Sequence, residues 1–117
     1  MAIKRLHVGK RMSEAVVCNG IAFLAGQVAE DASQDITGQT KQVLEAIDEL
    51  LAEAGSDKSR LVSASIFLAD MNDFAAMNAV WDGWVSPGNT PARATVQVQL
   101  AQPKWRVEIV VTAEVGK

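Results

Sequence analysis

Two charged residues near the C-terminal end of the chain have the types and the spacing to bind and transform a small anion. Arg93 opens a stretch in which polar and apolar residues alternate, and its face continues through the uncharged Thr95 and Gln97. A guanidinium held on a strand can bind a carboxylate through two parallel hydrogen bonds. A surface arginine or a structural ion pair would show the same spacing, so the pattern alone leaves both interpretations open.

Glu108 lies on the polar side of the next alternating stretch. If the short link 101–104 joins the two stretches as an antiparallel hairpin, Glu108 lies opposite Thr95 with a tight turn or opposite Gln97 with a looser one. Neighbouring pairs on one face are roughly 7 Å apart, so we expect its carboxylate to share a pocket with Arg93. A solvated ion pair with a neighbouring basic residue is the alternative.

Residues for other kinds of chemistry are sparse. The one histidine, His7, has no nucleophile elbow nearby and is expected to be an ordinary strand or surface residue. The one cysteine, Cys18, lies in an apolar run typical of the core; a lone cysteine forms no intramolecular disulfide and builds no zinc site. The spacing of Trp81 and Trp84 favours core packing over a ligand box. The sequence predicts no metal and no cofactor.

Composition limits the partners. The chain has 117 residues, is 49% hydrophobic and carries a formal net charge of −3, which fits one folded domain over 1–117. An acidic chain offers little to a phosphate backbone, so nucleic acid is not an expected partner. The start of the chain lacks the apolar run of a signal peptide, and no stretch approaches the roughly 20 apolar residues of a membrane span. We expect a cytoplasmic protein with no membrane partner.

The first half of the chain predicts a hairpin followed by a long helix. Asn19-Gly20 between the apolar runs 15–18 and 21–25 is a strong hairpin signal, because both residues tolerate the positive φ of a type I′ turn. Apolar residues at helical spacing then run from Asp35, a plausible N-cap, to Gly55, the expected residue after the helix.

The second half predicts a strand over 59–69, a helix capped by Asn72 or Asp73, and two closing strands over 93–100 and 105–113. The order is three strands, helix, strand, helix, two strands, which predicts an α+β fold with both helices on one face of a mixed sheet. The other face needs solvent or a partner chain, so we expect an oligomer.

Several of these segments resemble the RidA/YjgF family, and in particular its short YoaB-like subgroup. Residues 91–98 (PARATVQV) resemble the family's Pro-x-Arg run opening a strand of alternating valines. Residues 107–109 (VEI), 25–27 (AGQ), and 70–74 with Asn78 match further family stretches. The resemblance covers nearly the whole chain, and the arginine strand is its most specific part.

The resemblance implies a chorismate-mutase-like fold with a six-stranded sheet, assembled as a homotrimer with clefts between subunits. It implies hydrolysis of 2-aminoacrylate-type enamines and other 2-imino acids to 2-oxo acids and ammonia, without metal or cofactor. Arg93 would hold the carboxylate, Glu108 would position water and move a proton, and the Gly26 backbone and the Thr95 hydroxyl would contact substrate or water.

Three positions depart from the family pattern. Met12 replaces a tyrosine, Ala25 replaces a serine and Thr95 replaces a cysteine. These changes leave the two charged roles in place and predict a less polar substrate pocket lined by Met12 and Ala25. Because two hydroxyls are lost, a protein that binds 2-oxo acids or amino acids without turnover is the alternative interpretation.

Overall fold

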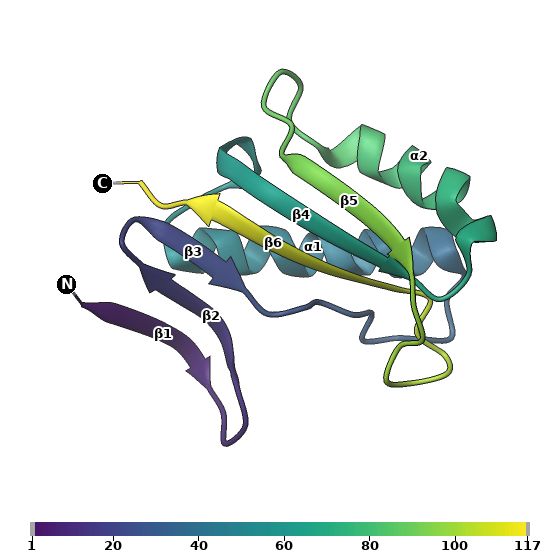
Figure 1. Ribbon diagram of the computed structural model, residues 1–117, viewed down its shortest axis with the longest axis horizontal. Helices are drawn as coiled ribbons and strands as arrows, with labels where there is room; N and C mark the ends of the chain where they lie inside the picture. The colour runs from purple at the N-terminus through teal and green to yellow at the C-terminus, as the bar shows by residue number, and fades with distance from the viewer. Residues whose placement is uncertain (1, 117) are drawn as a thin grey trace.

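The computed structural model describes residues 2–116, which form one mixed six-stranded sheet backed by helices (Figure 1). The strand order across the sheet is β1-β2-β3-β6-β4-β5. The pairing of β4 with β5 is parallel and the other pairings are antiparallel. The strands are β1 (Ile3–Val8), β2 (Ser13–Cys18), β3 (Ile21–Leu24), β4 (Leu61–Leu68), β5 (Ala92–Gln97) and β6 (Val107–Glu114).

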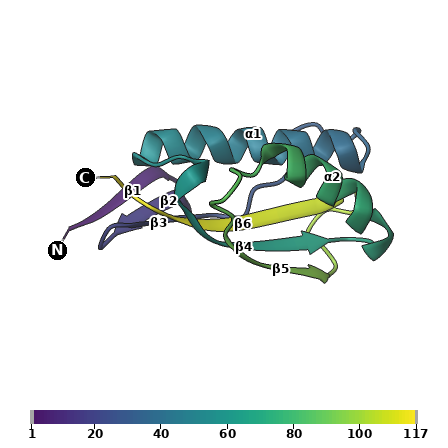
Figure 2. The same cartoon turned by 90° about the horizontal axis from the view of Figure 1, so that it is seen from above.

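Two α-helices, α1 (Ile36–Ala54) and α2 (Phe74–Trp84), lie on the same side of the sheet (Figure 2). Short 3-10 turns, η1 (Lys58–Arg60) and η2 (Met71–Asp73), precede β4 and α2. The predicted element order and the one-sided helix layer are confirmed. Within residues 2–116, no helix combines the length and apolarity needed to cross a bilayer.

The predicted hairpin at Asn19-Gly20 is present between β2 and β3. Asn19 has φ 54° and Gly20 has φ 79°, so both central residues adopt the left-handed conformation that a type I′ turn requires. The register pairs Cys18 with Ile21 and Val16 with Phe23. The turn therefore sets which residues of β2 and β3 face the helices. Cys18 is only partly buried and falls on the other face, so its predicted place in the core was wrong.

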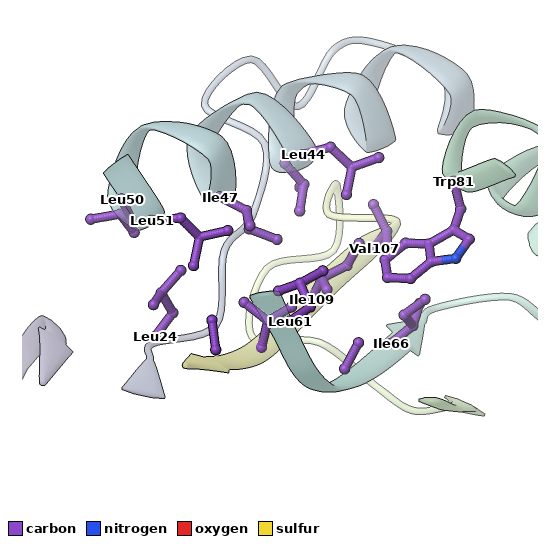
Figure 3. Close-up of a cluster of buried hydrophobic side chains, with 14 of the residues drawn as sticks. Leu24, Leu44, Ile47, Leu50, Leu51, Leu61, Ile66, Trp81, Val107 and Ile109 are labelled. Atoms are coloured by element: carbon purple, nitrogen blue, oxygen red, sulfur yellow. The ribbon is translucent and has the colours of Figure 1, made fainter. Parts of the chain in front are cut away.

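Both predicted ends of α1 are confirmed. The Asp35 carboxylate accepts a 2.8 Å hydrogen bond from the Gly38 N–H, and Gly55 at φ 86° donates its N–H back to the last turn. Between these caps, the apolar stripe of α1 packs on the sheet (Figure 3). Its fully or nearly fully buried apolar members are Ile36, Val43, Leu44, Ile47, Leu50, Leu51 and Ala54.

The start of α2 differs from the prediction in one respect. Asp73 precedes the helix, but its side chain makes no capping hydrogen bond. It binds the guanidinium of Arg106 instead, through two 3.1 Å hydrogen bonds. The Asp70 carboxylate caps the preceding 3-10 turn by accepting from the Asn72 N–H. Tertiary pairing, rather than local capping, thus explains the aspartate at position 73.

The predicted antiparallel hairpin between the last two strands was wrong, because β4 lies between β5 and β6 (Figure 1). At the end of β4, the Val98 N–H donates to the carbonyl of Leu68 on one side, and the Ala69 N–H donates to that of Arg106 on the other. Parallel strands need a long crossover, usually a helix. The segment from β4 through α2 to β5 is such a unit, so β5 pairs with β4 and the link after it crosses to β6.

The sheet face away from the helices is uncovered within one chain. Side chains alternate between the two faces of a strand. Ala22, Ile66 and Ile109 are therefore buried under the helices, whereas Phe23 (49% exposed) and Val96 (47% exposed) lie on the open face. Apolar side chains on an open sheet face are typical of a surface that meets another chain.

Candidate functional site

Arg93 lies on the edge strand β5, on the helix-covered face of the sheet. Its register partner on β4 is Ala64, which is buried and paired in turn with the buried Val111 of β6. The Arg93 guanidinium carbon lies 5.4 Å from the centre of the Trp81 ring of α2. Within residues 2–116 no carboxylate forms an ion pair with Arg93. Its N–H groups therefore remain available to an outside anion.

Two further polar groups belong to the same region of β5 and α2. Thr95 shares the face of Arg93, since its register partner is the buried Ile66. Its Oγ1 atom and the Oδ1 atom of Asn78 are buried, with no hydrogen-bond partner within the described residues. Unpaired buried oxygens are uncommon in proteins and call for a ligand, a water or another chain. Asn78 lies one helical turn before Trp81, so the sequence spacing alone could have indicated that the two residues share one face of α2.

Glu108 lies on the opposite face of the sheet from Arg93. It pairs in register with Phe67 of β4, while its neighbours Val107 and Ile109 point into the core. No ion pair or side-chain hydrogen bond engages its carboxylate in the described part of the chain. Glu108 is therefore a second uncompensated charge, on the open face.

The segment holding Ala25 and Gly26 lies against Glu108. Gln27 and Ile109 exchange backbone hydrogen bonds of 2.9 and 3.1 Å, which fix this segment beside β6. A Cβ atom built on Gly26 would stand 2.8 Å from Cδ of Glu108, so only glycine leaves room for the carboxyl group. The sequence predicted that the Gly26 backbone contacts substrate or water, and the structure places this residue beside the Glu108 carboxylate.

Met12 lies at the β1–β2 turn, half exposed, and lines a hollow together with Glu14. The Glu14 carboxylate accepts from the side chain of Gln27, and its carbonyl accepts from the N–H of Ala25. These contacts join β2 to the segment beside Glu108. Ala25 therefore belongs to that segment, and Met12 lies two residues before Glu14, the strand residue that holds it.

The candidate residues therefore fall into two groups in one chain, here named half-sites. The arginine half-site comprises the predicted Arg93 and Thr95 with Asn78 and Trp81 of α2, which the sequence did not assign to a site. The glutamate half-site comprises the predicted Glu108, Gly26, Ala25 and Met12. The expectation that Arg93 and Glu108 share a pocket within one chain was wrong, because β4 separates their strands and the register turns them to opposite faces. A hollow of about 590 Å³ between α1 and α2 is lined by none of these residues.

Comparison with known proteins identifies the class to which this fold and these half-sites belong. The family model described as Endoribonuclease L-PSP matches residues 2–115. A "RutC family protein" of Haemophilus ducreyi is 50% identical over 97% of both chains. "RutC family protein YoaB" of Escherichia coli is 45% identical over 98% of this chain and 100% of its own.

A solved structure agrees closely with this chain. NMB1025 of Neisseria meningitidis, described as a member of the YjgF protein family, has a TM-score of 0.97 and 50% identity, with 100% of this chain and 98% of that chain covered. The chain belongs to the RidA/YjgF family, which the names RutC and Endoribonuclease L-PSP also denote here. The predicted family and its open six-stranded fold are confirmed.

Proposed function

We propose that this protein is a cytoplasmic, cofactor-independent deaminase that hydrolyses 2-imino acids and their enamine tautomers to 2-oxo acids and ammonia. The observation that carries the proposal is the pair of uncompensated charges, Arg93 and Glu108, on opposite faces of one sheet. Leaving a charge unpaired is costly unless it meets water or a ligand. A carboxylate-bearing substrate supplies the missing partner of Arg93, and a water molecule supplies that of Glu108.

We infer that a complete site needs two chains. Arg93 and Glu108 point away from each other across the sheet, so a single chain cannot present both to one small molecule. If a second copy packs the open face of its sheet beside β5 of the first copy, the Glu108 of the second copy can approach the Arg93 of the first. We therefore propose a homotrimer with a substrate cleft at each subunit boundary, since cyclic symmetry repeats one such contact around a closed ring.

In the proposed reaction, Arg93 binds the substrate carboxylate and fixes the imine carbon against a water molecule. Glu108 accepts a proton from the water as its oxygen bonds to that carbon, and passes the proton to the imine nitrogen to give a neutral carbinolamine. Glu108 then takes the hydroxyl proton of the carbinolamine and delivers it to nitrogen as the C–N bond breaks, which releases ammonia and leaves the 2-oxo acid. An enamine substrate first gains a proton at its terminal carbon and loses one from nitrogen, which forms the same imine.

The remaining residues would shape the cleft. The Gly26 N–H and the unpaired oxygens of Thr95 and Asn78 can hydrogen-bond to the substrate or the water. Met12 and Ala25 present apolar groups, so we propose that the pocket accepts substrates with apolar side chains. This preference is measured by varying the amino acid from which the imine is made.

The proposal is tested by generating imino acids with an amino-acid oxidase, trapping the surplus with semicarbazide and following 2-oxo acid formation. Arg93→Ala should lower kcat/KM by about 10- to 150-fold, the equivalent of about 1.5–3 kcal/mol for hydrogen bonds to a charged group. Arg60→Ala is the matched control, because within residues 2–116 Arg60 binds only Glu114, at the surface. Absence of acceleration by the wild type with every imine tried would reject a deaminase.

Carboxylate binding without turnover is the second candidate function. It is favoured by the apolar residues Met12 and Ala25, which place no hydroxyl beside Glu108. Calorimetric binding of a 2-oxo acid that disappears in Arg93→Ala, with no turnover of any imine, would select this candidate.

RNA cleavage, which the name of the matching family model suggests, is less well supported. The basic residues that gather in one place are Lys4, Arg5, Lys10 and Arg11, on β1 and the turn after it. Strand β1 is a sheet edge, where lysine and arginine commonly prevent edge-to-edge association. The overall charge of −3 also opposes binding of a polyanion.

A further inference from the structure

The Arg93 guanidinium lies over the face of a buried tryptophan, 5.4 Å from the ring centre of Trp81. We propose that Trp81 is a positioning residue that holds Arg93 ready for the substrate carboxylate. This inference rests on the proposed function and assigns the indole ring a role beyond core packing. Trp81 itself touches the arginine and not the substrate.

Trp81 is a rigid support. Only 4% of the residue is exposed, and Figure 3 shows its side chain pointing from α2 towards Ile66 and Val107 in the core. On its other side lies the ring of Trp84, with the two centres 5.4 Å apart and the planes inclined by 51°. The Trp84 Nε1–H donates to the Asp48 carboxylate of α1 at 2.9 Å. A continuous chain of contacts thus connects α1 with the edge strand β5.

Arg93 can contact the Trp81 ring and a substrate carboxylate at the same time. A cation–π contact uses the face of the guanidinium or its charge above the ring, whereas bidentate carboxylate binding uses the N–H groups at its edge. Because no carboxylate of the described residues pairs with Arg93, the Trp81 ring is the contact that restrains an otherwise exposed, long side chain. Restraint before binding lowers the entropy lost when the substrate is bound.

The substitutions Trp81→Phe and Trp81→Leu separate the aromatic face from the loss of volume. Both shorten a core side chain, but only phenylalanine keeps a π face. We expect Trp81→Leu to raise KM for the imine and the Kd for 2-oxobutanoate by about 2- to 30-fold, the range expected for cation–π contacts at exposed and desolvated sites. The change in kcat should be smaller, because carboxylate binding contributes alike to ground and transition states. Trp81→Phe should retain most of the wild-type affinity.

Met77→Val is the matched control for packing. Met77 is fully buried on α2, one turn before Trp81, and offers no aromatic face to Arg93. Met77→Val should lower the midpoint of urea unfolding, as the Trp81 variants do, while leaving KM near that of the wild type. An independent readout is the NMR signal of the Arg93 side chain, assigned with Arg93→Lys. The ring current of Trp81 should shift it upfield in the wild type and in Met77→Val, but not in Trp81→Leu.

The outcomes are decisive. Equal KM for Trp81→Leu and Trp81→Phe, an equal loss in Met77→Val, or an unshifted Arg93 signal in the wild type would each overturn the positioning role. These results leave the proposed function standing if Arg93→Ala still lowers kcat/KM by about 10- to 150-fold. If the wild type neither binds 2-oxobutanoate nor hydrolyses imines, the proposed function itself fails, and the NMR shift then records a contact with no catalytic role.

Discussion

At the scale of single residues, the approach of Gly26 to the Glu108 side chain decides where that carboxylate can lie. The backbone at this point is anchored by the paired hydrogen bonds between Gln27 and Ile109. A side chain at position 26 would stand 2.8 Å from Cδ and 3.1 Å from Cγ of Glu108. Because the backbone is held and the glutamate side chain is flexible, the glutamate must move. A substitution at this position would therefore act first on the Glu108 side chain and not on the backbone.

We expect Gly26→Ala to lower imine hydrolysis by about 100-fold, the effect of misplacing a reacting group by about 1 Å. Thermal unfolding should change little, since the displaced atoms belong to the end of a side chain. Gly83→Ala is the control, because a Cβ there meets nothing within 4 Å and alanine favours the helix. Wild-type activity in Gly26→Ala would mean that the position of Glu108 is unimportant.

At the scale of the elements, a buried polar network holds the start of β6 against both helices. The side chain of Gln39, fully buried on α1, donates to the carbonyl of Lys104 and accepts from the N–H of Arg106. The Arg106 guanidinium in turn binds Asp73 at the start of α2. Hydrogen bonding to Asp73 raises the pKa of Arg106, so the guanidinium stays charged. The network thereby fixes the start of β6, the strand that carries Glu108.

Asp73→Asn should destabilise the fold by about 1–2 kcal/mol, less than a fully buried pair because the Arg106 side chain is 45% exposed. The control Glu114→Gln removes the partner of Arg60 in a more exposed pair and should cost less than about 0.5 kcal/mol. Urea unfolding of both variants measures the difference. Similar small losses in the two variants would show that the Asp73 pair is only a surface contact.

At the scale of the whole molecule, the distribution of the two half-sites on opposite faces predicts activity shared between subunits. A subunit carrying Arg93→Ala still offers Glu108 to its neighbour, and one carrying Glu108→Gln still offers Arg93. Each variant alone should lose most of its activity. When the two are co-expressed with different tags and purified as mixed oligomers, about one third of the boundary sites should combine both native residues, because one of the three boundaries in every mixed trimer does so.

Recovery of about that fraction of wild-type activity would support the shared cleft. A mixed oligomer no more active than its parents would show instead that Arg93 and Glu108 act within one chain, and full activity of either parent would show that its altered residue is not required. Sedimentation of the wild type gives the number of subunits in the same preparation.

The sequence by itself determined the local features. Asn19-Gly20 defined its turn through positive φ, Asp35 and Gly55 defined the ends of α1 through hydrogen bonds made within a few residues, and the strand around Arg93 identified the family. These features depend on backbone conformations and contacts between near neighbours, which short patterns encode directly.

Only the tertiary structure decided which strands are neighbours, and hence the geometry of the site. The short link after β5 suggested a hairpin, yet β5 pairs with β4 across the helical crossover and leaves β6 on the other side of β4. Strand pairing is settled by burial and hydrogen bonding summed over residues distant in sequence, so a local spacing does not specify it. That one choice turns Arg93 and Glu108 to opposite faces, and it makes Trp81, expected only to fill the core, the residue beneath the arginine.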